Sequence, residues 1–378
     1  MGNPLLRKGT PLTQLSPRGA AALDVDVEPT AAGSVPTSEG AGRASSRSLL
    51  ARWRAWLSAV LNDPRDHVFV ELGLAMTALQ VPFAVALFAW GSFSWWLAVG
   101  YWAIWGVLFF DRYILMLHCV SHRPLFRKRY RALNHYIPVM LGVLYGQTPH
   151  TYFGHHLGMH HKENNGGADL SSTMRYQRDS FLAWLRYYLT FLFVGLPLLV
   201  RYLVRKNRTR LARRVACGEL GFWAGVALLG AFVSGQAALV VFVIPVLVVR
   251  TLMMMGNWTQ HAFIDAGDSA SPFKNSITCI NTRYNRRCFN DGYHIVHHFR
   301  PALHYTEMAQ EFEDRKEEYG RNDAVVFDGL DYFQIWLLLM LGRWRPLARA
   351  FVRLPGAPAR SDEEVIAFLE SRLSPIEP

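Results

Sequence analysis

The sequence is poor in charged residues and in cysteine. Of its 378 residues 18% are charged, against the roughly 25% that is usual in soluble domains. The four cysteines form no C-x-x-C pair, so their spacing suggests no disulfide framework, zinc ribbon or iron–sulfur motif. Apolar residues are abundant instead, at 51% of the chain, and they are clustered. Such clusters indicate a membrane protein.

The net charge of +11 is not accompanied by a nucleic-acid-binding motif, so no nucleic acid partner is expected. The basic runs flank apolar stretches, for example at 127–131 and 205–214. This arrangement is typical of the cytoplasmic ends of membrane helices.

Four apolar stretches approach the ~20 residues that cross a hydrocarbon core. They are about 68–90, 92–110, 217–233 and 237–255. Ser-Gly-Gln alone separates the last two, which predicts a transmembrane hairpin. The sequence therefore predicts an all-α membrane protein with about four transmembrane helices and a cytoplasmic helical cap.

Two further apolar stretches are assigned to the interface or to the protein core. Residues 136–146 are too few to span, and 187–200, with Pro197, is marginal. A competing topology makes 187–200 one span and 222–249 another. That topology would place the basic residues between 201 and 214 outside, against the positive-inside rule.

The rest of the chain divides by composition. Residues 1–48 read as a disordered tail, 49–66 as an interfacial helix, 67–310 as the membrane domain and 311–378 as a C-terminal cytoplasmic helical region. Within the last region, residues 333–342 are apolar but too few to span. Ser361 and Glu364 form a capping box that opens a helix over 362–373.

Most of the fourteen histidines gather in short motifs. These are HCVSH (118–122), HHLGMHH (155–161), HIVHH (294–298) and NWTQH (257–261). On a helix the i, i+4 spacing puts two imidazoles on one face, so His156 and His160 are expected to share a face, with His161 beside them. Each motif follows the end of an apolar span on the same side, which favours a joint metal site over solvated histidines.

Imidazole ligands suit Zn, Cu, Fe and Ni. Eight or nine clustered histidines exceed the needs of one ion and imply two. No cysteine or methionine cluster indicates copper, and the Glu-x-x-His pairs of carboxylate-bridged di-iron bundles are missing. A histidine-rich di-iron centre that activates O2 remains.

HCVSH, HLGMHH and HIVHH resemble the three histidine boxes of the integral-membrane fatty acid desaturase superfamily, which also contains hydroxylases and related oxygenases. NWTQH is similar to the family's Asn-x-x-x-His element, and the resemblance runs from about 68 to 307. It implies that 67–310 is a desaturase-like domain. The implied metal ligands are His118, His122, His156, His160, His161, His261, His294, His297, His298 and, through water, Asn257. His155 could replace His156.

The remaining four histidines are not expected to be metal ligands. His150 and His304 flank boxes and are expected to be structural or to support ligands, and His67 and His135 to be unrelated. Asp169 and Asp291, close to the boxes in sequence, are candidate acceptors for ligand N–H groups, which ligating imidazoles usually need.

The resemblance implies a fatty acyl desaturase that uses two Fe ions and O2, with a fatty acyl lipid as substrate. The sequence contains no His-Pro-Gly-Gly segment, which would mark a fused cytochrome b5 domain, so an external electron donor of ferredoxin or cytochrome b5 type is expected. The alternatives are a membrane hydroxylase or oxygenase and, more remotely, a non-catalytic metal-binding or transport protein. Transport usually needs polar ligands at mid-membrane depth, whereas these histidines lie beyond the spans. Seven aromatic residues near the spans either line a substrate channel or belong to an interfacial aromatic belt and ordinary packing. They are Trp95, Trp96, Trp102, Trp105, Phe109, Phe110 and Trp258.

Overall fold

The apolar segments of the sequence form long helices in the computed structural model, which describes residues 38–89 and 91–377. The elements up to the last long apolar helix are α1 (Ser38–Val60), η1 (Pro64–Asp66), α2 (His67–Ala89), α3 (Trp95–Ala103), η2 (Ile104–Phe109), α4 (Phe110–His122), η3 (Lys128–His135), η4 (Tyr136–Leu141), η5 (Gly142–Tyr145), α5 (Thr151–His155), η6 (His156–His160), α6 (His161–Glu163), α7 (Phe181–Arg205), α8 (Thr209–Phe232), α9 (Gly235–Ala238), η7 (Leu239–Val243) and α10 (Ile244–Gln260). They are followed by α11 (Pro272–Asn275), β1 (Ile277–Ile280), α12 (Arg283–Arg287), α13 (His294–Phe299), η8 (Tyr305–Glu307), α14 (Met308–Asp314), α15 (Lys316–Arg321), β2 (Val325–Asp328), α16 (Tyr332–Met340), α17 (Trp344–Ala350) and α18 (Asp362–Ser371).

The chain divides into two units after Arg52. In the first unit the described residues, 38–52, are helical and form the beginning of α1. This helix starts at Ser38, inside the stretch predicted to be a disordered tail. The rest of that predicted tail, 1–37, lies outside the described residues. The second unit begins at Trp53 and contains all of the histidine motifs.

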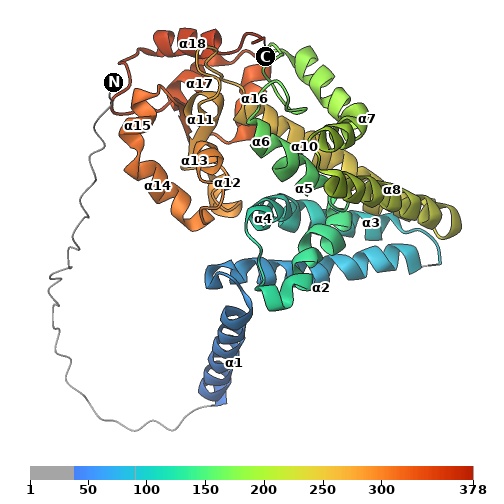
Figure 1. Ribbon diagram of the computed structural model, residues 1–378. Helices are drawn as coiled ribbons and strands as arrows, with labels where there is room; N and C mark the ends of the chain where they lie inside the picture. The colour runs from blue at the N-terminus through green and yellow to red at the C-terminus, as the bar shows by residue number, and fades with distance from the viewer. Residues whose placement is uncertain (1–37, 90, 378) are drawn as a thin grey trace, which may run out of the picture. The chain divides into compact units, whose positions relative to one another are not determined.

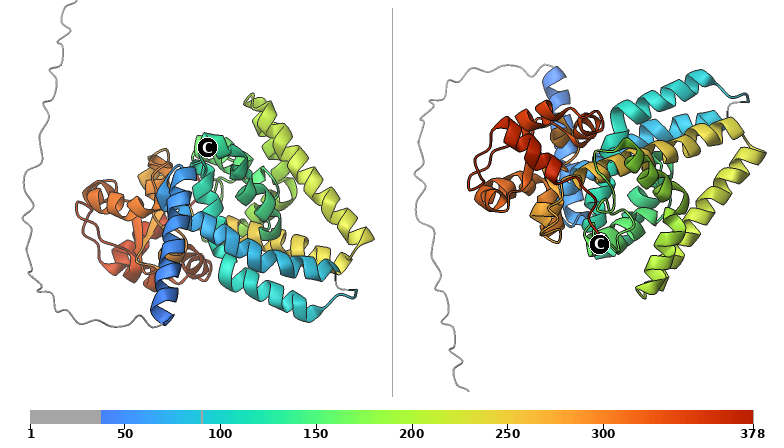
Figure 2. Two further views of the ribbon diagram at one scale, coloured as in Figure 1. Left: turned by 90° about the horizontal axis from the view of Figure 1, so that it is seen from below. Right: turned by 90° about the horizontal axis from the view of Figure 1, so that it is seen from above.

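Five helical stretches are long and apolar enough to cross a membrane: Pro64–Ala89, Trp95–His122, Phe181–Arg205, Thr209–Phe232 and Gly235–Gln260. The all-α membrane fold is thereby confirmed. Four of the five coincide with the predicted spans. The stretches at α2, α3 and α8 extend away from the C-terminal elements, which are drawn in orange and red (Figures 1 and 2).

The fifth stretch, α7, corrects the prediction that 187–200 is marginal in length. Ser180 caps its first turn by accepting a hydrogen bond from the backbone N–H of Ala183, and the helix continues through Pro197 for 25 residues. The polar and aromatic residues on both flanks are helical too, so the apolar run understates the helix.

Contacts at the two ends of α7 show that length alone does not make it a crossing helix. Near its start, the Tyr187 hydroxyl lies 2.8 Å from Nδ2 of Asn257, at the end of α10. Near its end, Tyr202 hydrogen-bonds the carboxylate of Glu163, just after the second histidine motif. Both ends therefore lie beside the histidine-bearing segments. Two crossings, by α8 and α10, suffice to return the chain to the same side, in agreement with about four spans.

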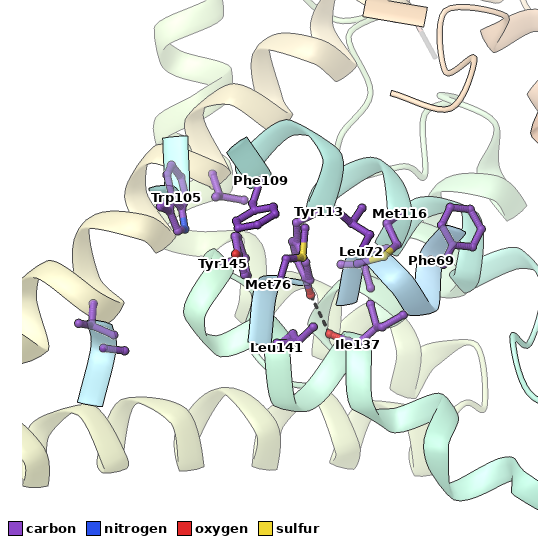
Figure 3. Packing of buried hydrophobic residues seen from close by; sticks show 14 of the residues in the cluster. Phe69, Leu72, Met76, Trp105, Phe109, Tyr113, Met116, Ile137, Leu141 and Tyr145 are labelled. Atoms are coloured by element: carbon purple, nitrogen blue, oxygen red, sulfur yellow. Dashed lines mark hydrogen bonds between the residues drawn. The ribbon is translucent and has the colours of Figure 1, made fainter. Parts of the chain in front are cut away.

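The core between the first helices fixes the position of the first histidine motif. Figure 3 shows Met76 of α2, Tyr113 of α4 and Ile137 of η4 packed together. The Tyr113 hydroxyl donates to the carbonyl of Ile137 at 3.0 Å. Residues 136–145 thus pack in the core, as predicted for a segment too short to span.

The C-terminal elements form a second core. Strands β1 and β2 pair in parallel, with Ile277 opposite Val325. Helix α16 buries Ile335 and Leu339 in this core and leaves Phe333 exposed. The predicted capping box is confirmed: Ser361 accepts from the N–H of Glu364, whose carboxylate accepts from the N–H of Ser361.

Candidate metal centre

Nine histidines, from α4, η6, α6, α13 and the turn that follows α10, converge in two groups. In each group one nitrogen per residue lies within 4.8 Å of the others. The first group is His118, His122, His156, His161 and His297, and the second is His160, His261, His294 and His298. The nine are the histidines that the sequence motifs single out, and every one of them has at least one neighbour from another segment of the chain.

The first group is built around His297 and His156. The Nε2 atom of His297 lies 2.9 Å from Nε2 of His118 and 2.9 Å from Nε2 of His161. The Nε2 atom of His156 lies 2.9 Å from Nε2 of His122 and 3.2 Å from that of His161. All five rings therefore present Nε2 to a common centre.

The imidazoles of the second group are arranged in the same way. The Nε2 atom of His294 lies 3.0 Å from Nε2 of His298 and 3.4 Å from Nε2 of His261. The ring of His160 lies 5.3 Å from that of His261 between centroids. Helix α13 contributes to both groups, because His294 and His298 are one turn apart and His297 points to the other group.

The second motif departs from the predicted α-helical spacing. Residues His156–His160 form a π turn, in which the N–H of His161 bonds to the carbonyl of His156. In such a turn residues five apart lie over one another, so His156 pairs with His161. The rings of His156 and His160 still lie close, with centroids 5.9 Å apart, but the two residues belong to different groups. One short segment thereby serves both groups.

Three ligand candidates are anchored through Nδ1. His118 Nδ1 lies 2.9 Å from Oδ1 of Asp291, and His160 Nδ1 lies 2.7 Å from Oδ2 of Asp169. Both carboxylates are the acceptors that were proposed from their proximity in sequence. The third anchor, the carbonyl of Asn275 at 2.7 Å from His261 Nδ1, carries no sequence signal because any residue supplies a carbonyl.

These anchors determine where the lone pairs point. A carboxylate or carbonyl oxygen only accepts, so each anchored Nδ1 carries the proton and its Nε2 presents a lone pair to the group. Burial and neighbouring imidazoles lower the pKa of His294, His297 and His298 well below its usual value, and lower that of His261 to about 3. Neutral imidazoles with converging lone pairs fit a metal cation. The donor set suits Fe as well as Zn, Cu or Ni.

Asn257 is held beside the second group with its amide N–H groups already used. Its Nδ2 donates to the carbonyl of Ser171 at 3.0 Å and to the hydroxyl of Tyr187 at 2.8 Å. This leaves Oδ1 as the free acceptor. Ser171 and Tyr187 were missed from the sequence, since neither stands at a fixed spacing from a histidine motif.

The other histidines lie outside both groups. His155 packs against Phe191, with ring centroids 5.5 Å apart, and within the described residues its buried Nε2 has no hydrogen-bond partner. His304 contacts Asp66 at 3.1 Å. His150 lies 6.4 Å from His135 between ring centroids, and His67 bonds the carbonyl of Pro64. The geometry thus favours His156 over His155 as a ligand.

A cavity of about 370 Å³ opens onto both groups. It reaches His118 and His156 of the first group and His160 and His294 of the second. Its walls are mostly apolar; they include Phe110, Ile114, Leu115, Phe191, Leu252 and Met253–Met255. Of the seven aromatic residues proposed as channel walls, Phe110 alone lines this cavity. Trp95 and Trp96 are exposed, and Trp258 is buried in packing.

Comparison with known proteins gives one match. The model of the fatty acid desaturase family matches residues 94–329, which is more than half of the chain and includes all nine clustered histidines. No curated protein and no solved structure matches the chain.

Proposed function

The chain belongs to the fatty acid desaturase family, and we propose that it is an O2-dependent fatty acyl desaturase with a histidine-ligated di-iron centre. Membership of the family makes it a desaturase- or hydroxylase-type enzyme of lipids. The proposal adds the reaction, the metal and the ligands.

One observation carries the proposal: two all-histidine groups lie at the wall of one apolar cavity. Two groups match two ions, since the nine imidazoles together exceed what a single ion accepts. The proposed ligands are the nine clustered histidines, with Asn257 reaching the second ion through water. When bound, the iron pair would supply the activation of O2 that removes hydrogen from an unactivated C–H bond.

The protein itself positions the substrate and excludes water. Leu115 and Met254 are among the apolar residues that would hold an acyl chain against both groups. Asp291 and Asp169 keep a proton on Nδ1 of His118 and His160, so that Nε2 stays available for iron. The electron donor would be an external ferredoxin or cytochrome b5, and the histidines would face the cytoplasm.

Expression of the chain in a host, followed by analysis of the host's acyl chains, tests the proposal. New double bonds are expected with the parent chain and none with His297→Ala, because His297 lies 2.9 Å from two other members of its group. His135→Ala is the matched control, since His135 is exposed and outside both groups.

The product mass separates the alternatives. Loss of two hydrogens supports a desaturase, and gain of one oxygen identifies a hydroxylase on the same centre. Unchanged acyl chains across the host's lipids would contradict both activities. Purified, fully loaded protein should contain about two Fe per chain, one for each histidine group.

A further inference from the structure

A second, much smaller cavity reaches the first histidine group. It has a volume of about 30 Å³ and touches His118, His122 and His297. It shares only Leu115, His118 and Asp291 with the large cavity. The first group can therefore be approached from two cavities, and the second group lines the large one.

The size of the small cavity limits what it admits. A space of ~10–15 Å³ holds one water molecule, so about 30 Å³ accommodates a diatomic molecule but not an acyl chain. The acyl chain has the larger cavity, at about 370 Å³.

The walls of the small cavity favour an uncharged, apolar molecule. Apart from the histidines they include Phe69, Phe289, Leu303 and Met308. Its two carboxylates are already paired: Asp66 with Arg123 at 3.1 Å and with His304 at 3.1 Å, and Asp291 with His118 at 2.9 Å. An ion would lose its hydration on entering without gaining a free partner.

The outer end of the small cavity meets a surface depression. Arg123, Pro301 and Leu303 line both. The depression is wide, at about 580 Å³, and is lined mainly by polar residues such as Arg65 and Glu307. Leu303, which is half-buried, thus stands where the narrow cavity joins the surface.

We infer that this narrow cavity is the route by which dioxygen reaches the first histidine group. The inference rests on the proposed function. An acyl chain in the large cavity would cover His118, His156, His160 and His294 from that side. A separate route lets dioxygen arrive while the substrate stays in place, and Leu303 controls its width.

Leu303→Trp tests the route, with Ala302→Trp as the matched control. Ala302 lines the surface depression but not the narrow cavity. A tryptophan at this position therefore places a side chain of the same size outside the route. Leu303→Trp should raise the KM for O2 several-fold, with the KM for the acyl substrate and the iron content unchanged. Ala302→Trp should leave all three values at those of the parent chain.

Binding of nitric oxide to the reduced iron, followed by stopped-flow absorbance without substrate or turnover, is the second measurement. Leu303→Trp should slow it several-fold, and Leu303→Ala should not. The inference is overturned if the rate and the KM for O2 stay at parent values, or if both tryptophan variants change them alike. Because nitric oxide binding needs no acyl product, it still decides the route if the desaturase proposal fails.

Discussion

The two histidine groups differ in how firmly the protein holds them. In the first group, His118 alone has a hydrogen bond through Nδ1 to another residue among those the structure describes, to Asp291. In the second, His160 and His261 are both anchored, and Asn257 is fixed beside them. The first group also borders both the narrow and the large cavity, and the second borders the large one.

The anchors of the second group come largely from one loop. Asp169 accepts from His160, and Ser171 accepts from Asn257. Thr173 in the same loop donates to the carbonyl of His261 at 2.6 Å. The number of ligands and the number of residues that support them are therefore separate properties, because the group with more histidines has fewer anchors. A preorganised group should bind iron more tightly.

Removing one ligand from each group gives the largest expected effect. His160→Ala and His161→Ala alter neighbouring residues that belong to different groups. Each should abolish lipid oxidation and remove about half of the bound iron, because an ion loses one of its imidazoles. Elemental analysis of the purified variants measures the iron. If either variant alone lost all of it, the division into two groups would be refuted.

Breaking the anchor of the second group should weaken one ion selectively. Asp169→Asn removes a fully buried carboxylate that accepts from His160 Nδ1, Ser171 N and Ser171 Oγ. Iron affinity at the second group should fall by about 10–100-fold, measured by competition with a ferrous chelator. Asp291→Asn is the counterpart in the first group, and it should leave the second ion in place.

The order in which the two groups lose iron should follow the number of their anchors. In the parent chain a ferrous chelator should remove iron in two phases, with the less supported first group emptying first. In His161→Ala the fast phase should be missing, and in His160→Ala the slow one, as measured by absorbance of the chelate. A single phase in the parent chain would mean that the anchors make no difference.

The smallest effect is expected from Tyr187→Phe. Asn257 would keep its bond to Ser171 and lose the one to Tyr187, a change worth about 1 kcal/mol. Iron content should stay constant and the turnover rate should fall only a few-fold. A complete loss of activity would show that Asn257 depends on Tyr187 far more than one hydrogen bond explains.

The sequence predicted the composition of this centre better than its arrangement. Spacing and order of the motifs identify the nine histidines, and proximity in sequence suggests Asp169 and Asp291. The partition of His156, His160 and His161 was out of reach, since it depends on a π turn that no residue type announces. The length of α7 was understated because Pro197 and the polar flanks do not end a helix there.

The π turn at His156–His160 also bears on how the length of this motif can vary among related proteins. Such a turn contains one residue more than an α-helical turn would need. Deleting Leu157 should let the segment relax to a regular α-helix in which His156 and His161 are four residues apart and stay on one face, so that the motif takes the spacing of His294, His297 and His298. Functional relatives should therefore accept either spacing in this motif, H-x-x-x-H-H in a π turn or H-x-x-H-H in an α-helical turn.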